Sequence, residues 1–387
     1  MKILNVFLAA TIITALTLTS KLNAETDKNE KAVVTSVMRA NFEALTNLQP
    51  YIADEKKFQD PKNSAEIQKN LDILANFKHV FPKGSLDREP GFAAIASLFG
   101  EYLQDVQRAF KEGGRGTFVR NQVKTITGFC MNCHTRVGSE KSFEDLGKRV
   151  DTLTLSKFQR AEFYAATRQF DKALAALDEL ISNSPEGEFA LLEFARAIRQ
   201  VLSITVRVKQ DPNLTSAFLD KIDKRKDVPD YFKRYVASWK KSVASWKQER
   251  STGGKLSAES HMAKARLLVQ QASKEQLFAV DPTGDVSFLR ATNHIHEALQ
   301  KSPQGKFRGE ALYLLGVSYD ALKDPLLWAL DSMYFETCVR EFPHTEISKK
   351  CYKRYATKLY FDYSGSGGTF VPEDELEKLG KLRKLSE

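Results

Sequence analysis

Histidine, methionine and cysteine are scarce in this sequence, which has 6 histidines, 5 methionines and 4 cysteines among 387 residues. The four histidines of the second half, His261, His294, His296 and His344, show no metal-type clustering. His294 and His296 stand two residues apart on a predicted helix, so they cannot share a face. The sequence therefore predicts no multi-histidine metal centre in this half.

Motifs for common enzyme chemistry are also missing. The chain has neither a Gly-Lys phosphate loop nor a Gly-x-Ser-x-Gly elbow. It also lacks a nucleic-acid-binding motif, so the net charge of +9 points to an acidic protein partner or to a solvated basic surface. We expect no catalytic residues and no nucleic-acid partner.

Long hydrophobic runs are confined to the N-terminus, where apolar residues extend from Ile3 to about Leu18 after Met1 and Lys2. This pattern predicts a signal peptide over residues 1–24, cleaved after Ala24. No later run approaches the roughly 18 apolar residues of a spanning helix. Because no cysteine stands at the cleavage point, a lipid anchor is not expected. We expect a periplasmic protein without an integral membrane segment.

Helical periodicity runs along the whole sequence without a clear strand alternation, which predicts an all-α fold. Four amphipathic segments between residues 30 and 140 predict an up-down four-helix bundle. Pro50 is expected to close the first segment, and Asn63 with Glu66 resembles a capping box at the start of the second. The apolar stripes are Val34, Met38, Leu45 and Leu48; Ile67, Leu71, Leu74 and Phe77; Ile95, Phe99, Tyr102, Val106 and Phe110; and Val119, Val123 and Ile126.

Shorter helical pairs follow between residues 153 and 362, at a spacing that resembles tetratricopeptide repeats. The resemblance implies stacked helix pairs, each burying an apolar face against its neighbours. The small and aromatic positions that carry it are Ala161, Tyr164, Phe170, Ala173, Leu177, Leu180, Ala291, Ile295, Ala298, Leu315, Gly316 and Tyr319.

Aromatic and basic residues alternate in one segment of this region. Its apolar residues step by four and three, which is the spacing of a single helix face. Although a membrane-surface helix is the alternative, we interpret the face as part of the core. The stripe comprises Phe232, Val236, Trp239, Val243 and Trp246. The remaining residues, 363–387, predict a flexible Gly-Ser tail followed by a short charged helix.

One short motif carries specific chemistry: Cys130-Met131-Asn132-Cys133-His134. Cys-x-x-Cys-His is the attachment signature of c-type haem. On a helix the two cysteines and the histidine lie on one face, so two thiols can bond the porphyrin while the imidazole ligates its iron. We therefore expect one covalent haem c, held by Cys130 and Cys133, with His134 as the proximal ligand.

Two other chemistries use a Cys-x-x-Cys pair. A thioredoxin-like redox motif requires a strand-to-helix context, whereas this motif ends a helical segment. A zinc site requires further ligands at close spacing, and none is nearby in the sequence. Both alternatives are therefore disfavoured.

The position of the motif, at the end of the fourth predicted helix, resembles that of the cytochrome c-prime family, the class II cytochromes. The segment Met38-Arg39-Ala40-Asn41-Phe42 in the first helix adds to this resemblance. It implies a four-helix bundle over residues 30–140 whose last helix binds haem, and a function in electron transfer or small-gas binding. It also implies that Arg136 lies near a haem propionate.

The sixth position on the iron is open to several interpretations. Helix one of the family packs over this haem face, so the resemblance implies that Met38 is a possible distal ligand, although it equally suits a packing role. His79 is a second candidate. Without a protein ligand, the iron would bind NO or CO.

The other two cysteines, Cys338 and Cys351, flank a predicted turn at Pro343. In an oxidising compartment they predict a structural disulfide, with two separate buried thiols as the alternative.

Together these features predict a periplasmic electron carrier that is not an enzyme, whose repeat domain docks a redox partner protein. A haem-based sensor of NO or CO is the alternative function, and a scaffold with a structural haem is a third. The family resemblance also implies a possible homodimer.

Overall fold

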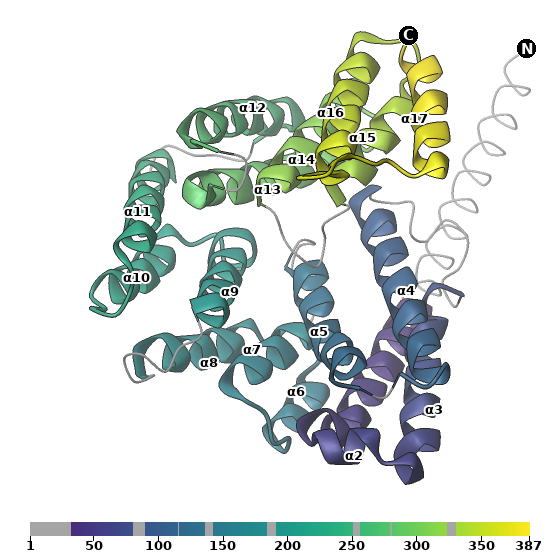
Figure 1. Ribbon diagram of the computed structural model, residues 1–387. Coiled ribbons are helices and arrows are strands. Elements are labelled where there is room, and N and C mark those ends of the chain that lie inside the picture. The colour runs from purple at the N-terminus through teal and green to yellow at the C-terminus, as the bar shows by residue number, and fades with distance from the viewer. Residues whose placement is uncertain are drawn as a thin grey trace, which may run out of the picture. The chain divides into compact units, whose positions relative to one another are not determined.

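The computed structural model describes residues 32–79, 90–114, 116–135, 142–183, 191–250, 256–278, 281–322 and 330–387. These residues are almost all helical, which confirms the all-α class (Figure 1). Their contacts form two compact units, Met1–Arg88 with Gly100–Arg120, and Glu89–Phe99 with Asn121–Glu387. No helix within the described ranges combines the length and apolarity needed to cross a membrane. The predicted signal peptide lies outside these ranges.

The first unit begins with a helix over residues 32–53, on which Leu45, Leu48 and Ile52 are at most 2% exposed. The prediction that Pro50 closes this helix was wrong, because the helix continues three residues beyond it. Proline lacks a backbone N–H, and this close to the helix end the lost hydrogen bond affects only the last turn.

Short elements follow this helix: α2 (Glu55–Gln59), η1 (Pro61–Asn63), α3 (Ser64–Ala75) and η2 (Asn76–His79). The predicted capping box was wrong, since the Asn63 side chain makes no cap hydrogen bond and donates instead to the Lys57 carbonyl at 2.8 Å. A capping residue normally has an extended backbone, whereas Asn63 is already helical, with φ −91° and ψ −7°.

Polar and aromatic side chains connect the elements of the first unit. Asn47 donates to Asn70 of α3 at 3.2 Å, and the Phe58 and Phe110 rings lie 5.6 Å apart. The Arg120 guanidinium pairs with Glu55 at 3.0 Å. Phe110 belongs to α4 (Pro90–Lys111) and Arg120 to α5 (Thr117–His134), so every amphipathic segment predicted before residue 140 is helical.

Both α4 and α5 extend from the first unit into the second. The rings of Phe99 and Phe129 lie 5.3 Å apart and join the parts of the two helices that belong to the second unit. The division between units thus falls within these two helices, whereas the sequence placed a boundary between residues 140 and 153.

The second unit continues as a series of helices. Several begin at side-chain caps; Ser156, for example, forms a full capping box with Gln159. The helices are α6 (Glu144–Asp151), α7 (Lys157–Ala166), α8 (Phe170–Asn183), α9 (Leu191–Leu202), α10 (Pro212–Asp223), α11 (Asp230–Arg250), α12 (Ala258–Glu275), α13 (Asp285–Lys301), α14 (Arg308–Leu322), α15 (Leu330–Glu341) and α16 (Glu346–Asp362), with a π-helix at Ser203–Val208 and a 3-10 turn at Pro282–Gly284.

Consecutive helices of this unit pack most closely against one another, notably α7 with α8, α10 with α11, α12 with α13, and α14 with α15 (Figure 1). Such neighbour-to-neighbour packing buries faces that single helix pairs leave open. The side chains at the predicted small and aromatic positions are buried: Ala161, Tyr164, Phe170, Ala173, Leu177, Leu180, Ala291, Ile295, Ala298, Leu315 and Tyr319.

The aromatic stripe on α11 belongs to the core, as predicted. Its five side chains are no more than 7% exposed. The indole N–H of Trp239 donates to the Pro282 carbonyl at 2.6 Å, so the polar atom of the largest side chain is also satisfied. The stripe therefore packs within the protein.

The C-terminal residues form regular structure where the sequence predicted a flexible segment. Strands β1 (Ser364–Gly365) and β2 (Gly368–Thr369) pair antiparallel and lead to α17 (Glu373–Ser386). Leu379 and Leu382 of α17 are buried, and the helix packs against α15 and α16. These contacts hold α17, at the position of the predicted short charged helix, against its neighbours.

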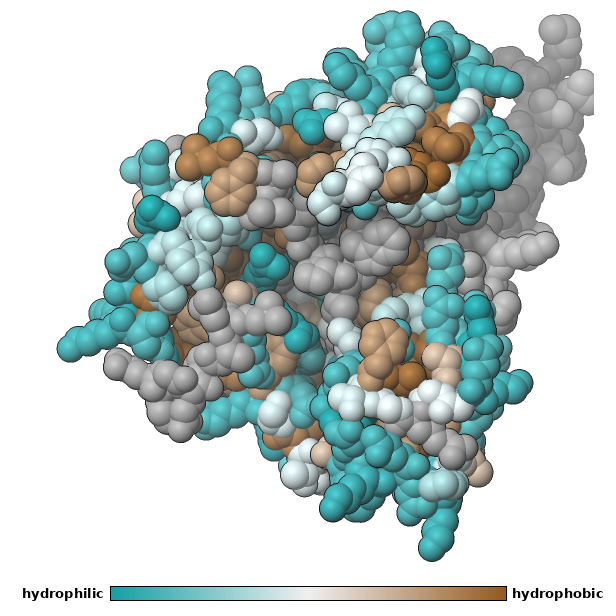
Figure 2. Space-filling model, in the orientation of Figure 1, coloured by the Kyte–Doolittle hydropathy of each residue, from teal (hydrophilic) through white to brown (hydrophobic). Residues whose placement is uncertain are grey.

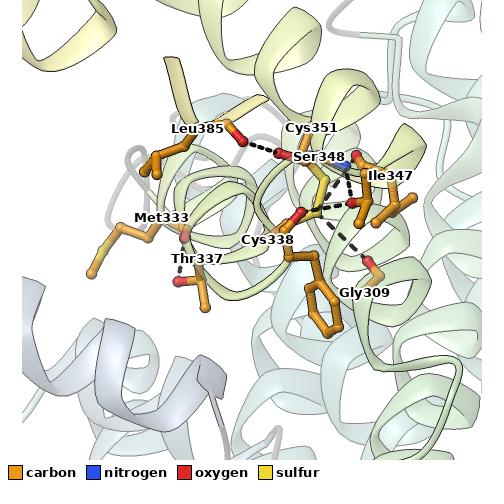
Figure 3. The surroundings of a disulfide bond; sticks show 10 residues. Gly309, Met333, Thr337, Cys338, Ile347, Ser348, Cys351 and Leu385 are labelled. Carbon is orange, nitrogen blue, oxygen red and sulfur yellow. Dashed lines mark hydrogen bonds between the residues drawn. A yellow bond between two sulfur atoms is a disulfide. The ribbon is translucent and has the colours of Figure 1, made fainter. Parts of the chain in front are cut away.

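A disulfide joins Cys338 of α15 to Cys351 of α16, with a Cα–Cα distance of 6.2 Å (Figure 3). Both residues are fully buried. The Ser348 hydroxyl, beside the disulfide, donates to the Leu385 carbonyl of α17 at 3.5 Å. The bond thus links two packed helices close to the C-terminal one.

On the face shown in Figure 2, hydrophilic side chains predominate along the outer edges of the helices, and hydrophobic ones gather in smaller groups. Scattered exposed hydrophobic residues are normal for a folded chain. Phe118, Leu277 and Phe370 are the most exposed large ones among the described residues.

Candidate haem site

The three residues of the attachment motif lie in the last turn of α5, which ends at His134. Their spacing of three and four residues places Cys130, Cys133 and His134 on one side of the helix. All three are half-buried, whereas Met131 and Thr135, which flank them on the helix, are 2% exposed. The structure therefore brings the predicted cofactor-binding residues together on one partly accessible face.

Neither motif cysteine forms a disulfide, in contrast to Cys338 and Cys351. Burial raises the pKa of the Cys130 thiol to about 12, and the neighbouring Cys133 and Glu162 add to the shift. The Cys130 thiol donates to the Ile126 carbonyl at 3.6 Å. A redox-active Cys-x-x-Cys pair requires a lowered thiol pKa, so these surroundings disfavour thioredoxin-like chemistry.

The imidazole of His134 is held in its neutral form. Burial lowers its pKa to about 4, and the nearby Arg168 charge lowers it further. The carbonyls of Ala165 and Ala166, at the end of α7, partly oppose this shift, although Nδ1 makes no hydrogen bond of standard geometry. A neutral imidazole ligates metal through one nitrogen while the other donates to a carbonyl, and these carbonyls are suited to that role.

A buried carboxylate behind the motif was not predicted from the sequence. Glu162 of α7 is 2% exposed and accepts a hydrogen bond from Thr127 of α5 at 2.6 Å. Its other oxygen accepts from Arg196 and Gln200 of α9 at 3.3 and 3.0 Å. Burial raises the pKa of Glu162 to about 6 despite these bonds. This network attaches the motif helix α5 to α7 and α9.

Three further residues were predicted to lie near the haem: Met38, His79 and Arg136. Met38 is half-buried on the helix over residues 32–53, which belongs to the first unit, whereas the motif belongs to the second. The side chain of His79 and the whole of Arg136 lie outside the described residues.

The donor set fits a covalently attached haem: two cysteines outside any disulfide, a neutral imidazole, and a buried His134 Nδ1 atom without a hydrogen-bond partner. Across the described ranges, no group of three or more His, Cys, Asp or Glu side chains could hold a metal ion. The zinc-site alternative therefore lacks a ligand set in that part of the chain.

A histidine pair elsewhere was also missed in the sequence. The Nδ1 atoms of His261 on α12 and His294 on α13 lie 3.0 Å apart. The two histidines lie on different helices, and no sequence signal pairs residues of different helices. Two histidines alone do not complete a metal site.

Comparison with known proteins found no match: no family model, no curated protein and no solved structure matches this chain.

Proposed function

We propose that this protein is an exported c-type cytochrome that carries one covalent haem on α5 and transfers electrons to a partner protein. The observation that carries the proposal is that Cys130 and Cys133, beside His134 in the last turn of that helix, form no disulfide. The other two cysteines of the chain are joined to each other. A chain in which one cysteine pair forms a disulfide and the other does not has a separate use for the second pair.

Different residues of the chain would anchor the porphyrin, ligate the iron and orient the ligand. Cys130 and Cys133 would anchor the porphyrin, and His134 would ligate the iron. The Ala165 and Ala166 carbonyls would orient the imidazole by accepting from Nδ1, as second-shell groups commonly do. When bound, the haem iron supplies reversible one-electron chemistry.

The proposal also assigns a role to the two parts of the chain on either side of the motif. We interpret residues 30–140 as a cytochrome c-prime-like bundle and residues 153–362 as tetratricopeptide-like repeats that dock the partner. The net charge of +9 favours an acidic partner surface. Export by the predicted signal peptide places the protein in the periplasm, where haem attachment and the Cys338–Cys351 disulfide are both compatible with the redox conditions.

Haem content is the direct test. The full chain, matured in a host that attaches haem to exported proteins, should give a pyridine haemochrome spectrum and a mass increase of one haem. A C130S/C133S variant should lose both signals. A C338A/C351A variant should keep them, which separates loss of attachment from general loss of cysteine.

A colourless wild-type protein, or a pigment that acidified organic solvent extracts, would refute covalent attachment. If haem is attached, the identity of the sixth ligand follows from the M38L variant. Loss of a low-spin ferrous spectrum in M38L, together with new CO binding, would identify Met38 as the ligand. CO binding by the wild-type protein would instead favour the gas-binding function.

A further inference from the structure

A cavity of about 50 Å³ lies inside the second unit, behind the attachment motif. By the usual measure, about 10–15 Å³ of such space holds one water, so this volume accepts a few waters or one small solute. The lining is mixed, with charged side chains and short aliphatic walls. The lining residues used below are Asn132, Arg199, Leu202, Arg207, Asp285 and Tyr319.

Two charged side chains line this cavity, and they form no hydrogen bond or ion pair with each other. Asp285 is 3% exposed, and its Oδ1 atom is buried with no hydrogen-bond partner. Within the part of the chain that the structure describes, the Arg199 side chain makes no hydrogen bond or ion pair, although its charge acts on Asp285. A buried carboxyl group and a guanidinium that share a cavity but do not pair leave polar atoms for a third group to satisfy.

The second guanidinium is positioned by an unusual backbone. Arg207 lies on the π-helix Ser203–Val208, which interrupts the regular helix after α9. Such π-helical turns are rare and occur frequently at functional sites. The Asn293 amide donates to the carbonyls of Val206 and Arg207 at 3.1 and 3.2 Å, which stabilises this turn.

The same arginine is oriented from the opposite side by an aromatic residue. The Arg207 guanidinium donates to the Tyr319 hydroxyl at 3.2 Å and lies 5.5 Å from the centre of that ring. Tyr319 in turn stacks on Tyr334 at 5.6 Å. The cavity therefore has one guanidinium fixed by neighbours and another, Arg199, without a partner.

We propose that this cavity binds a small carboxylate, whose oxygens are bound by the Arg199 and Arg207 guanidiniums beside the buried carboxyl group of Asp285. Guanidinium groups match the planar geometry of a carboxylate. Leucine side chains such as Leu202 complete the wall and suit a short aliphatic chain. This activity is independent of the proposed haem function.

The cavity is distinct from the haem face. Asn132 follows Cys130 by two residues, which corresponds to about 200° around a helix. Asn132 also lies about 100° from Cys133, so the cavity meets a different side of α5 from the one that carries the thiols. A C130S/C133S variant that lacks haem but remains folded should bind the carboxylate as the wild type does, so the two proposals fail separately.

Titration calorimetry of the full chain with propionate tests the proposal, with the neutral isostere propionamide and inorganic phosphate as comparison probes. We expect propionate to bind in about the millimolar range, propionamide not to bind, and R199Q to weaken propionate binding about tenfold or more. R234Q removes an exposed arginine on α11 and should leave binding unchanged.

The pH dependence gives a second readout. Burial raises the pKa of Asp285 to about 8, opposed by the Arg199 charge and reinforced by Asp281. Arg207 is the other charged group that lines the cavity. Wild-type affinity should therefore fall above pH 8, when the carboxyl group ionises and repels the ligand, whereas D285N should bind propionate equally at pH 7 and 9.

Several outcomes would overturn the proposal. They are no propionate binding by the wild-type protein, equal binding of propionamide, binding of phosphate alone, or an unchanged affinity in a folded R199Q variant. Circular dichroism of each variant establishes that it is folded.

Discussion

Burial decides the protonation of several side chains inside the second unit. At His294, burial and the adjacent His261 lower the pKa to about 3. The 3.0 Å contact between their Nδ1 atoms requires one nitrogen to donate and the other to accept, so the accepting ring must be neutral. Protonation of both rings would remove this contact between α12 and α13.

The pH dependence of stability follows from this shift. Unfolded His294 binds a proton below about pH 6.5, whereas the folded residue resists until about pH 3. Its contribution is therefore complete above pH 6.5 and is lost as the pH falls, by about 2 kcal/mol between pH 6.5 and 4.5. Urea denaturation at these pH values should show a smaller loss for H294Q than for the wild type.

The matched control is H344N, which replaces an exposed histidine whose φ of 59° suits asparagine. Its stability should fall with pH as the wild type's does. An H294Q variant with an unchanged pH dependence would contradict the assignment to the histidine pair.

The sequence predicted which side chains share a helix face when they are close along the chain. It did not predict which side chains of different helices meet. Cys130, Cys133 and His134 share a helix face because their spacing requires it. Glu162, by contrast, reaches Thr127 from a different helix. No periodicity encodes which distant polar residue meets the motif helix.

At the scale of the helices, the close approach of two helices depends on single small residues. A Cβ atom added to Gly316 of α14 would lie 2.4 Å from the Phe335 ring of α15. Gly380 on α17 has nothing within 4 Å of the same position. We expect G316A to destabilise the protein by about 1–3 kcal/mol through overpacking.

The control substitution should act in the opposite direction. G380A should stabilise the protein by about 0.5–1 kcal/mol, because alanine favours a helix interior over glycine. Thermal unfolding of the two variants measures both effects. A neutral G316A variant would show that α14 and α15 do not approach each other as closely as described, and an added F335L substitution should recover part of the loss.

The disulfide stabilises the contact between α15 and α16. It joins residues 13 apart in the sequence, and a loop of this size contributes about 3 kcal/mol by restricting the unfolded chain. C338A/C351A should lower the urea midpoint by a corresponding amount. Reduction of the wild type should reproduce this shift and leave the variant unaffected; equal midpoints for oxidised and reduced wild type would contradict a stabilising role.

Apolar periodicity predicted the helices better than it predicted their ends. The helix over residues 32–53 passes through Pro50, and the π-helix at Ser203–Val208 has no recognisable signal in the sequence. The helix passes through Pro50 because its side chains pack in the core. The exposed Ser364–Gly368 segment is ordered locally by the pairing of β1 with β2.

For the whole molecule, the Glu162 network predicts that the motif helix α5 unfolds together with α7 and α9. T127V removes the 2.6 Å hydrogen bond from α5 to the buried carboxylate. We expect it to lower the free energy of unfolding by about 1–3 kcal/mol, because Glu162 is left less satisfied. T125V, which removes only an exposed bond to the Asn121 carbonyl, should have little effect.

The helix α5 unfolds either together with α7 and α9 or independently of them. Denaturation followed by far-ultraviolet circular dichroism and by the absorbance of the proposed haem distinguishes these two cases. Coincident transitions, both shifted by T127V, support cooperative unfolding of the second unit. A haem transition that T127V leaves unchanged would show that α5 is independent of α7 and α9.

The sequence by itself determined the helical class, the amphipathic faces and the shared face of the attachment motif, since each follows from residue spacing along one helix. Only the tertiary structure decided which helices those faces meet. It placed Glu162 behind the motif, paired His261 with His294 and enclosed Arg199 with Asp285. These contacts join residues far apart in the chain, and they arise from how many apolar faces pack at once, which no local pattern specifies.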